Sequence, residues 1–307
     1  MTRATIGLAM LTMGMLCVPV GSSRAEARGK ATTLQSEADR IRQKAEQGDA
    51  EAQNSLGILY ATGRGVPQDY TQAAAWFRKA AEQGNPGAQF NLGLMYDNGQ
   101  GVSQDPAQAA SWFRKSAEQG DANAQFSLGF MYSNGQGVPQ DYPQAVSWLH
   151  KSAEQGHAMA QYTLGAMYYN GRGVKQDFAQ AMSLIRKAAE QGDADAQSNL
   201  GAMYEKGQGA PQDYVQAVSW FRQAAEQGNA TAQYNLGIMY DSGRGVPQDY
   251  AEAHKWENLA ASRATGEDRK MYAEARDALA RVMTPEQLAD AQKRASDWQE
   301  AFEKRKK

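Results

Sequence analysis

Three sets of residues have types and spacings that could carry out chemistry. His150 and His157 flank the turn at 154–156, where two imidazoles and a carboxylate could converge on a metal ion. The glycine pair at 63–65 looks like a loop that binds phosphate. Aspartates such as Asp69 recur along the chain and are candidate general acids. The elements that position these residues decide between these interpretations.

Those elements follow a period of 36 residues that occurs six times without a gap from Asp49. Each unit carries the frame A-Q-x-x-L-G-x-x-Y-x-x-G-x-G-x-x-Q-D-x-x-x-A. A fixed period of this length is typical of a solenoid, in which each repeat buries its apolar face against the next. Leu56 and Tyr60 share one helix face, and Ala73 and Phe77 share another. Each repeat is therefore predicted to be a helical hairpin.

The repeat favours structural roles for all three sets. Each aspartate precedes the second helix with Gln or Glu three residues on, which predicts a capping box. The glycine pair has no strand before it, so it is predicted to end the first helix at positive φ and not to bind a nucleotide. His150, His157 and His254 stand where other units have Arg, Asp or Ala, so we interpret them as surface substitutions. Gly57 and its equivalents predict a close approach of two helix backbones. We expect no catalytic residue, no metal site and no cofactor.

The composition limits the classes of partner. The 307-residue chain has 32 basic and 34 acidic residues and a formal net charge of −2. Because there is no basic excess to hold a phosphate backbone, we expect no nucleic-acid partner. Cys17 is the only cysteine, and after removal of a leader the chain would have neither disulfides nor thiolate metal ligands.

The first residues have the parts of a secretory signal peptide at 1–27. Arg3 precedes an apolar run from Ile6 to Val20, and small residues follow, with cleavage expected near Ala25 or Ala27. The alternative is an uncleaved anchor, although the run is shorter than a usual membrane span. No later stretch is apolar enough to cross a membrane. We therefore expect the chain to be exported, either to the periplasm or as a secreted protein.

The run from Ala52 to Gly84 closely resembles the SEL-one-like repeat family, a relative of the tetratricopeptide repeats. The resemblance extends from Asp49 to about Ala261, and the departures are local, as where Leu184 replaces tryptophan. It implies an all-α fold, a right-handed α-solenoid of helix-turn-helix repeats between capping helices.

The predicted organisation has terminal segments on either side of the repeats. At the C-terminus, Thr284 with Pro285 and Gln287 predicts a capping box that begins a last helix. The predicted ranges are a signal peptide at 1–27, an N-terminal capping helix at 28–48, six repeats at 49–84, 85–120, 121–156, 157–192, 193–228 and 229–264, and C-terminal capping helices at 265–307.

Positions that vary among the repeats are candidates for recognition. They form a stripe on the first helix of each repeat, at spacings of four and three residues. The family resemblance implies that these helices line a concave groove with room for a protein or peptide partner. The members predicted to contact that partner are Phe90, Phe126, Phe130, Tyr162, Tyr169, Tyr234, Asp97, Glu205 and Asp241.

The charges of this stripe favour one kind of ligand over another. They are all acidic, which disfavours capture of a carboxylate and suits a neutral, basic or aromatic ligand. The alternative is that four of the aromatic residues simply pack between neighbouring helices: Phe90, Phe126, Tyr162 and Tyr234.

Three functional hypotheses follow. The first is a monomeric, non-catalytic scaffold or adaptor of a bacterial envelope or of the secreted space, including an envelope signalling regulator that acts through the same groove. The second is an enzyme, because cysteine-rich members of the resembled family have been connected with β-lactam hydrolysis. The absence of cysteines after residue 17 and of a convincing Ser-x-x-Lys nucleophile disfavours it. The third is a stack that joins end to end, which capped ends disfavour.

Overall fold

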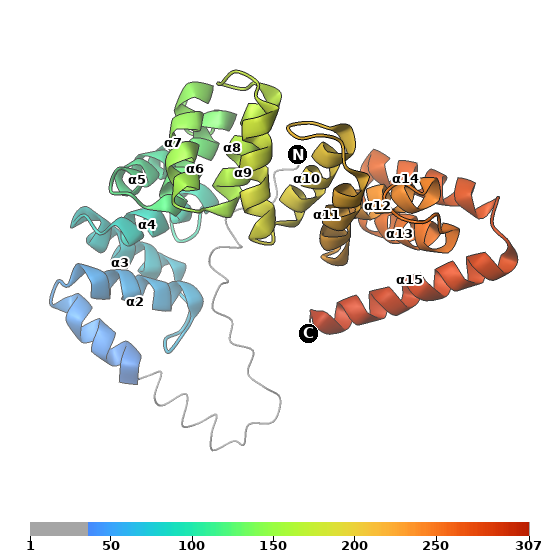
Figure 1. Cartoon of the computed structure of the whole chain (residues 1–307). Coiled ribbons are helices and arrows are strands. Elements are labelled where there is room, and N and C mark those ends of the chain that lie inside the picture. Colours follow the sequence, from blue (N-terminus) through green and yellow to red (C-terminus); the bar gives the residue numbers. More distant parts are fainter. Residues whose placement is uncertain (1–35, 307) are drawn as a thin grey trace, which may run out of the picture. The chain divides into compact units, whose positions relative to one another are not determined.

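The computed structural model describes residues 36–306 of the chain (Figure 1). All regular structure in this range is helical, which confirms the predicted all-α solenoid of six helical hairpins. A helix at residues 36–46 comes first. The paired helices of the repeats are α2 (Ala50–Thr62) and α3 (Tyr70–Glu82), α4 (Pro86–Asn98) and α5 (Pro106–Glu118), α6 (Ala122–Asn134) and α7 (Tyr142–Glu154), α8 (Ala158–Asn170) and α9 (Phe178–Glu190), α10 (Ala194–Lys206) and α11 (Tyr214–Glu226), and α12 (Ala230–Ser242) and α13 (Tyr250–Arg263). Two helices follow, α14 (Gly266–Ala280) and α15 (Pro285–Arg305). The predicted signal peptide, Cys17 and the start of the N-terminal capping segment lie outside the described residues.

The second helix of each repeat begins at an aspartate, as predicted. Asp69 Oδ1 accepts hydrogen bonds from the N–H groups of Thr71 (2.9 Å) and Gln72 (3.0 Å). The predicted return bond from Gln72 is absent, because the Asp69 N–H already donates to the Tyr60 carbonyl at 2.9 Å. The capping-box prediction is therefore wrong for these helices. It is confirmed for α15, where Thr284 and Gln287 bond reciprocally.

Glycines at two positions let the elements approach closely. A Cβ on Gly57 would lie 2.6 Å from ring atoms of Phe77, so the nearest neighbour there is an aromatic ring. At Gly129, Gly165 and Gly237 a Cβ would also lie 3.1 Å from a backbone atom of the second helix, which agrees with the predicted close approach of two backbones. Gly63 ends α2 at φ 72°, as predicted. Gly101 lies in the next loop of this kind, where a Cβ would collide with the Tyr70 carbonyl of the preceding repeat. The loop glycines thus serve packing between successive hairpins.

The described chain divides into two compact units, one ending at Gln155 and the other beginning at Gly156. The first unit contains α2 to α7, and its core is made of alternating layers from successive helices, such as Phe77 with Leu92. The second contains α8 to α15, and Phe221 with Leu236 occupies the equivalent place.

Within each unit a chain of buried glutamines joins consecutive hairpins. Gln89, 4% exposed, donates from Nε2 to the Ala81 carbonyl of the preceding repeat at 3.1 Å. Its Oε1 accepts from Gln119 Nε2 of its own repeat at 2.7 Å. The same pair of bonds recurs at Gln53, Gln125 and Gln197. We call this arrangement the glutamine ladder. It explains why the frame requires glutamine after its first alanine.

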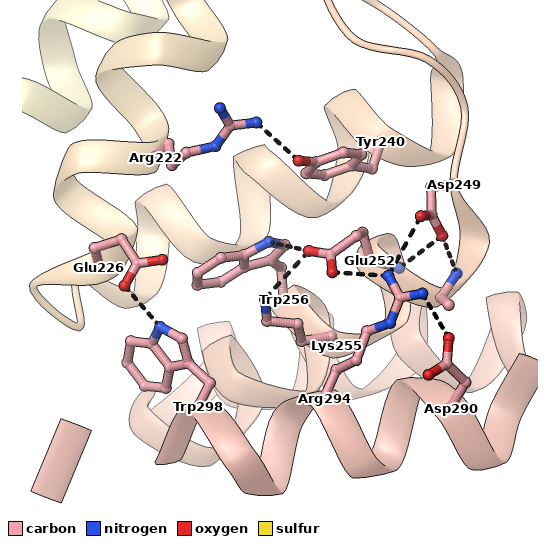
Figure 2. A network of polar contacts seen from close by, with 11 residues as sticks. Arg222, Glu226, Tyr240, Asp249, Glu252, Lys255, Trp256, Asp290, Arg294 and Trp298 are labelled. Atoms are coloured by element: carbon pink, nitrogen blue, oxygen red, sulfur yellow. Dashed lines mark hydrogen bonds and ion pairs between the residues drawn. The ribbon is translucent and has the colours of Figure 1, made fainter. Parts of the chain in front are cut away.

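The C-terminal helices complete the second unit. α14 packs on α13 and begins where the first helix of a seventh repeat would begin, since Tyr272 lies 36 residues after Leu236. α15 packs on α13 instead of continuing the hairpin pattern. Figure 2 shows Arg294 of α15 between Asp290 (2.6 Å), Glu252 (2.9 Å) and Asp249 (3.4 Å).

Aromatic contacts hold the other half of α15. The rings of Trp298 and Trp256 meet edge to face with centroids 5.8 Å apart, and Trp298 Nε1 donates to Glu226 at 2.9 Å (Figure 2). Trp298 also stacks on Phe302. Trp298 is 8% exposed and Trp256 is 2% exposed, so both are buried. The helix α15 therefore covers one face of α13, the second helix of the sixth repeat.

Candidate functional site

The variable stripe of the first helices is the candidate recognition site, and the structure gives it a different character in each unit. In the first unit it is largely closed. Phe126 is 1% exposed and Phe90 is 8% exposed. The Phe90 ring lies 5.6 Å from that of Phe113 on the second helix. These two rings are core residues, as in the alternative interpretation of the sequence, and they offer almost no surface to a partner.

Two other predicted residues of the first unit remain at the surface. Phe130 is half-buried, and its ring centroid lies 6.2 Å from that of Phe126. Asp97 is half-buried and accepts a hydrogen bond from Gln136 Nε2 of the next repeat at 2.9 Å. Burial raises the pKa of Asp97, while the bond from Gln136 opposes that rise. Asp97 therefore joins two repeats as well as facing outward.

In the second unit the stripe carries hydroxyl groups beside carboxylates. Tyr162 is half-buried, and its hydroxyl accepts from Asn199 Nδ2 of the next repeat at 2.7 Å. Burial, followed by the negative charges of Asp195 and Asp193, raises the pKa of Tyr162 to about 12. The negative potential around this ring would favour a cationic ligand over an anionic one.

Tyr169 follows the same pattern two helical turns later. Its hydroxyl donates to Gln208 Oε1 at 2.9 Å, and its ring meets the edge of Phe178 at 5.2 Å. The half-buried ring is thus held in one orientation by two neighbours. A fixed ring loses little entropy on binding, which suits a recognition surface.

The end of the stripe lies on α12. Tyr234 is half-buried and stacks on Tyr272 of α14, with ring centroids 4.3 Å apart. Glu205 is half-buried and Asp241 is exposed. Neither carboxylate forms an ion pair with another residue of the described range. Their charges are available to a partner.

The three histidines have separate structural surroundings. His157 begins α8, where its Nδ1 accepts from the Ala160 N–H at 3.2 Å. His150 pairs with Glu154 at 3.5 Å on an exposed helix face. His254 is 4% exposed, so its interpretation as a surface substitution is wrong: the position faces α14 instead of solvent. Within residues 36–306 no cluster of three His, Cys, Asp or Glu side chains could hold a metal ion.

One buried ionisable residue was missed at the sequence level. Glu257 is 4% exposed and occupies the position held by Phe77 and its equivalents in the other repeats. Burial, then the nearby Asp241, raises the pKa of Glu257 to about 7, against the opposing charge of Arg276. Comparison of this one column across the repeats would have revealed the substitution.

Among the described helices, a solvent-open pocket of about 610 Å³ lies between α13 and α15. Its wall includes Arg263, Gln299 and Phe302. Arg263 donates to Gln299 Oε1 at 2.6 Å and lies 4.9 Å above the Phe302 ring, so its guanidinium is already engaged. No helix of the described range is long and apolar enough to cross a membrane.

The repeats of this chain match the model of a known family. The Sel1 repeat model matches residues 50–85, 86–121, 122–157, 158–193, 194–229 and 230–264. These ranges start one residue after the repeats that we predicted from the sequence. No curated protein matches the chain.

Solved structures resemble the chain along most of its length. A Sel1 repeat protein from Oxalobacter formigenes is 34% identical, with a TM-score of 0.64 over 78% of this chain and 98% of that one. A protective antigen with an SLR fold from uropathogenic Escherichia coli is 33% identical over 88% of this chain and 72% of its own, with a TM-score of 0.40. A sel1 repeat protein from Klebsiella pneumoniae is 27% identical over 67% of this chain and 99% of its own, with a TM-score of 0.42.

Proposed function

Because the chain belongs to the Sel1 repeat family, whose repeats generally mediate protein–protein interaction, we propose that it is a non-catalytic scaffold that binds a protein or peptide along its first-helix stripe. The observation that carries the proposal is that constant and variable positions of the repeat have different roles. Constant residues such as Gln89 hold the hairpins together, whereas the variable stripe leaves its carboxylates and four of its six predicted aromatic rings at least partly exposed.

The contact set is narrower than the sequence suggested. The surface members are Phe130, Tyr162, Tyr169 and Tyr234, with Asp97, Glu205 and Asp241 as the charges. Phe90 and Phe126 are buried in the core and belong to the packing of the helices that present these surface residues. Rigid aromatic rings beside carboxylates suit a partner segment that carries apolar and basic side chains.

We place this scaffold outside the cytoplasm, in the bacterial periplasm or the secreted space. The support is the charged start, apolar run and small-residue site within residues 1–27. N-terminal sequencing of the chain recovered from the periplasm or medium of an expressing bacterium tests this. We expect a new N-terminus directly after Ala25 or Ala27. An intact Met1 in the membrane fraction would contradict cleavage and favour the anchor.

Site-specific photo-crosslinking tests the binding surface. A benzoylphenylalanine residue replaces Phe130 or Tyr169 in the stripe, and in a matched control it replaces Trp112, a half-buried aromatic of the second helix α5. We expect a discrete crosslinked protein from the stripe positions and none from the control. Substitution of Tyr162 and Tyr234 by serine should abolish that crosslink while circular dichroism stays unchanged.

The opposite pattern would contradict the proposal. A crosslink from position 112 alone would move recognition to the second helices. A crosslink that survives the tyrosine substitutions would show that the stripe aromatics do not contribute.

A further inference from the structure

The last repeat places a carboxyl group where the others bury a hydrophobic side chain. The equivalents of Glu257 are Phe77, Phe113, Leu149, Ile185 and Phe221, all buried. Glu257 is 4% exposed, and its Oε2 has no hydrogen-bond partner. An unpaired carboxyl oxygen costs stability at such a position, so its presence needs a compensating role.

The side chain of Glu257 lies against the stripe. A Cβ on Gly237 would come within 2.8 Å of Glu257 Cγ, so the side chain crosses the α12 backbone at this glycine. Tyr234 lies three residues before Gly237 and Asp241 four residues after it, which puts all three on one helix face. Tyr272 of α14 closes the other side by stacking on Tyr234 at 4.3 Å.

The charges around Glu257 leave its carboxyl without a committed counter-ion. Asp241 of α12 acts on it with like charge, and Arg276 of α14 with opposite charge. Arg276, however, is engaged with Asp277 at 2.6 Å and with Asn258 at 3.2 Å.

His254 lies three residues before Glu257 on α13. Burial and the charge of Arg276 lower its pKa, while Asp277 opposes that change, so this imidazole is neutral at neutral pH and supplies no cation.

We propose that Glu257, Asp241 and the stacked rings of Tyr234 and Tyr272 form a subsite for an ammonium or guanidinium group of the partner. The inference rests on the proposed function and adds the chemistry of the bound side chain. The exposed carboxylate of Asp241 attracts the cation, and the half-buried ring of Tyr234 contacts it, held in place by the buried ring of Tyr272. Glu257 neutralises the cation at depth.

Binding at this subsite has a measurable proton balance. The carboxyl of Glu257 has a pKa of about 7 in the free chain. At about pH 6 it is therefore mostly protonated, and pairing with a cation drives its proton into the buffer as the carboxylate forms. The release approaches about one proton per bound cation, and it requires Glu257 itself.

Isothermal titration calorimetry of the full chain provides the test. The probe is a short peptide in which lysine alternates with serine, and the control peptide has norleucine in place of lysine. At about pH 6 we expect the lysine peptide to bind with a heat that depends on the ionisation enthalpy of the buffer, and the norleucine peptide not to bind.

Matched variants assign the effect to the subsite. Glu257→Gln and Asp241→Asn should each weaken binding by about tenfold, and Glu257→Gln should also abolish the buffer dependence. Glu257→Phe introduces the side chain that three of the other repeats have at this position, and is expected to fold at least as well while losing the same binding. Glu118→Gln alters an exposed carboxylate of the first unit and should change nothing.

Several results would overturn the subsite. They are heats that do not depend on the buffer, equal binding by Glu257→Phe, and equal binding by the norleucine peptide. If the stripe still crosslinks a partner while the lysine peptide fails to bind, the subsite is wrong and the scaffold function stands. If the peptide binds through Glu257 but the stripe yields no crosslink, the scaffold proposal fails alone.

Discussion

Comparison of equivalent positions in the repeats shows what a single side chain contributes to the packing of the hairpins. Most glutamines of the ladder both donate and accept, but in the last repeat Arg263 stands where the donor glutamine would be. Gln233 still donates to the Ala225 carbonyl at 3.0 Å. Its buried Oε1, however, has no hydrogen-bond partner, because the donor glutamine is missing. The chain therefore contains a natural comparison between a complete and an incomplete member of the ladder.

We predict that Gln89→Leu destabilises its repeat more than Gln233→Leu destabilises the last one. Both glutamines are almost fully buried. Loss of Gln89 removes two side-chain hydrogen bonds, one to the Ala81 carbonyl and one from Gln119. Loss of Gln233 removes only the bond to the Ala225 carbonyl, together with an oxygen that is already unpaired. The difference should be about 1 kcal/mol. Native-state hydrogen exchange of each repeat measures it, and equal losses would refute the role assigned to the ladder.

Glu257 makes the stability of the last repeat depend on pH. Its pKa in the folded chain is raised from an ordinary 4.5 to about 7. Its protonated form is favoured by folding, so its contribution is fully present below about pH 4.5 and is lost as pH rises through about 7. The loss is on the order of 3 kcal/mol at most.

We expect Glu257→Gln to remove this dependence. Hydrogen exchange of α13 at about pH 5 and about pH 8, corrected for intrinsic rates, should show a smaller stability difference in the variant than in the native chain. The comparison cancels the titration of His254, which both chains share. Identical pH profiles would show that Glu257 is ionised throughout.

At the scale of helices, much was predictable from the sequence and some contacts were not. The periodic apolar residues predict both helices of every hairpin, because their spacing matches one helix face. The return bond from Gln72 was not predictable, since the competing bond from Asp69 N–H to Tyr60 depends on how the loop closes. Burial of Phe90 and Phe126 was one of two alternatives that the sequence left open, because a stripe on one helix does not reveal which neighbour covers it.

The docking of α15 depends on few side chains. We predict that Trp298→Ala releases the C-terminal half of this helix, because it removes the contacts with Trp256, Phe302 and Glu226 together. The local cost should be about 3–5 kcal/mol. Limited proteolysis measures the release. Lys304→Ala, which removes only an exposed pair with Glu300, should leave α15 as resistant as before.

At the scale of the whole chain, stability is a sum of local terms. Within each of the two units, each hairpin packs against its sequence neighbours, as expected for repeat proteins. A local defect should therefore weaken its own repeat and the adjacent ones while leaving distant repeats protected.

Gly93→Ala provides that defect. A Cβ at this position would lie 2.6 Å from the Phe113 ring, which has to shift within a buried layer. We expect faster hydrogen exchange in α4, α5 and their neighbours, and unchanged exchange in α11 to α13. Uniformly faster exchange along the chain would instead indicate one cooperative unit.

The glutamine ladder also affects how genes of this kind can change length. In the ladder, Nε2 of one glutamine donates to an alanine carbonyl of the preceding hairpin, as at Gln89, Gln125 and Gln197. Unequal recombination that removes or duplicates one whole period therefore brings the same two kinds of atom together again. An internal hairpin can thus be lost or duplicated during evolution without breaking this hydrogen-bond pattern. The last one is not, because Glu257, Arg263 and the surface that receives α15 are suited to the end of the stack. Selection on the number of repeats can therefore act internally while the C-terminal end stays fixed.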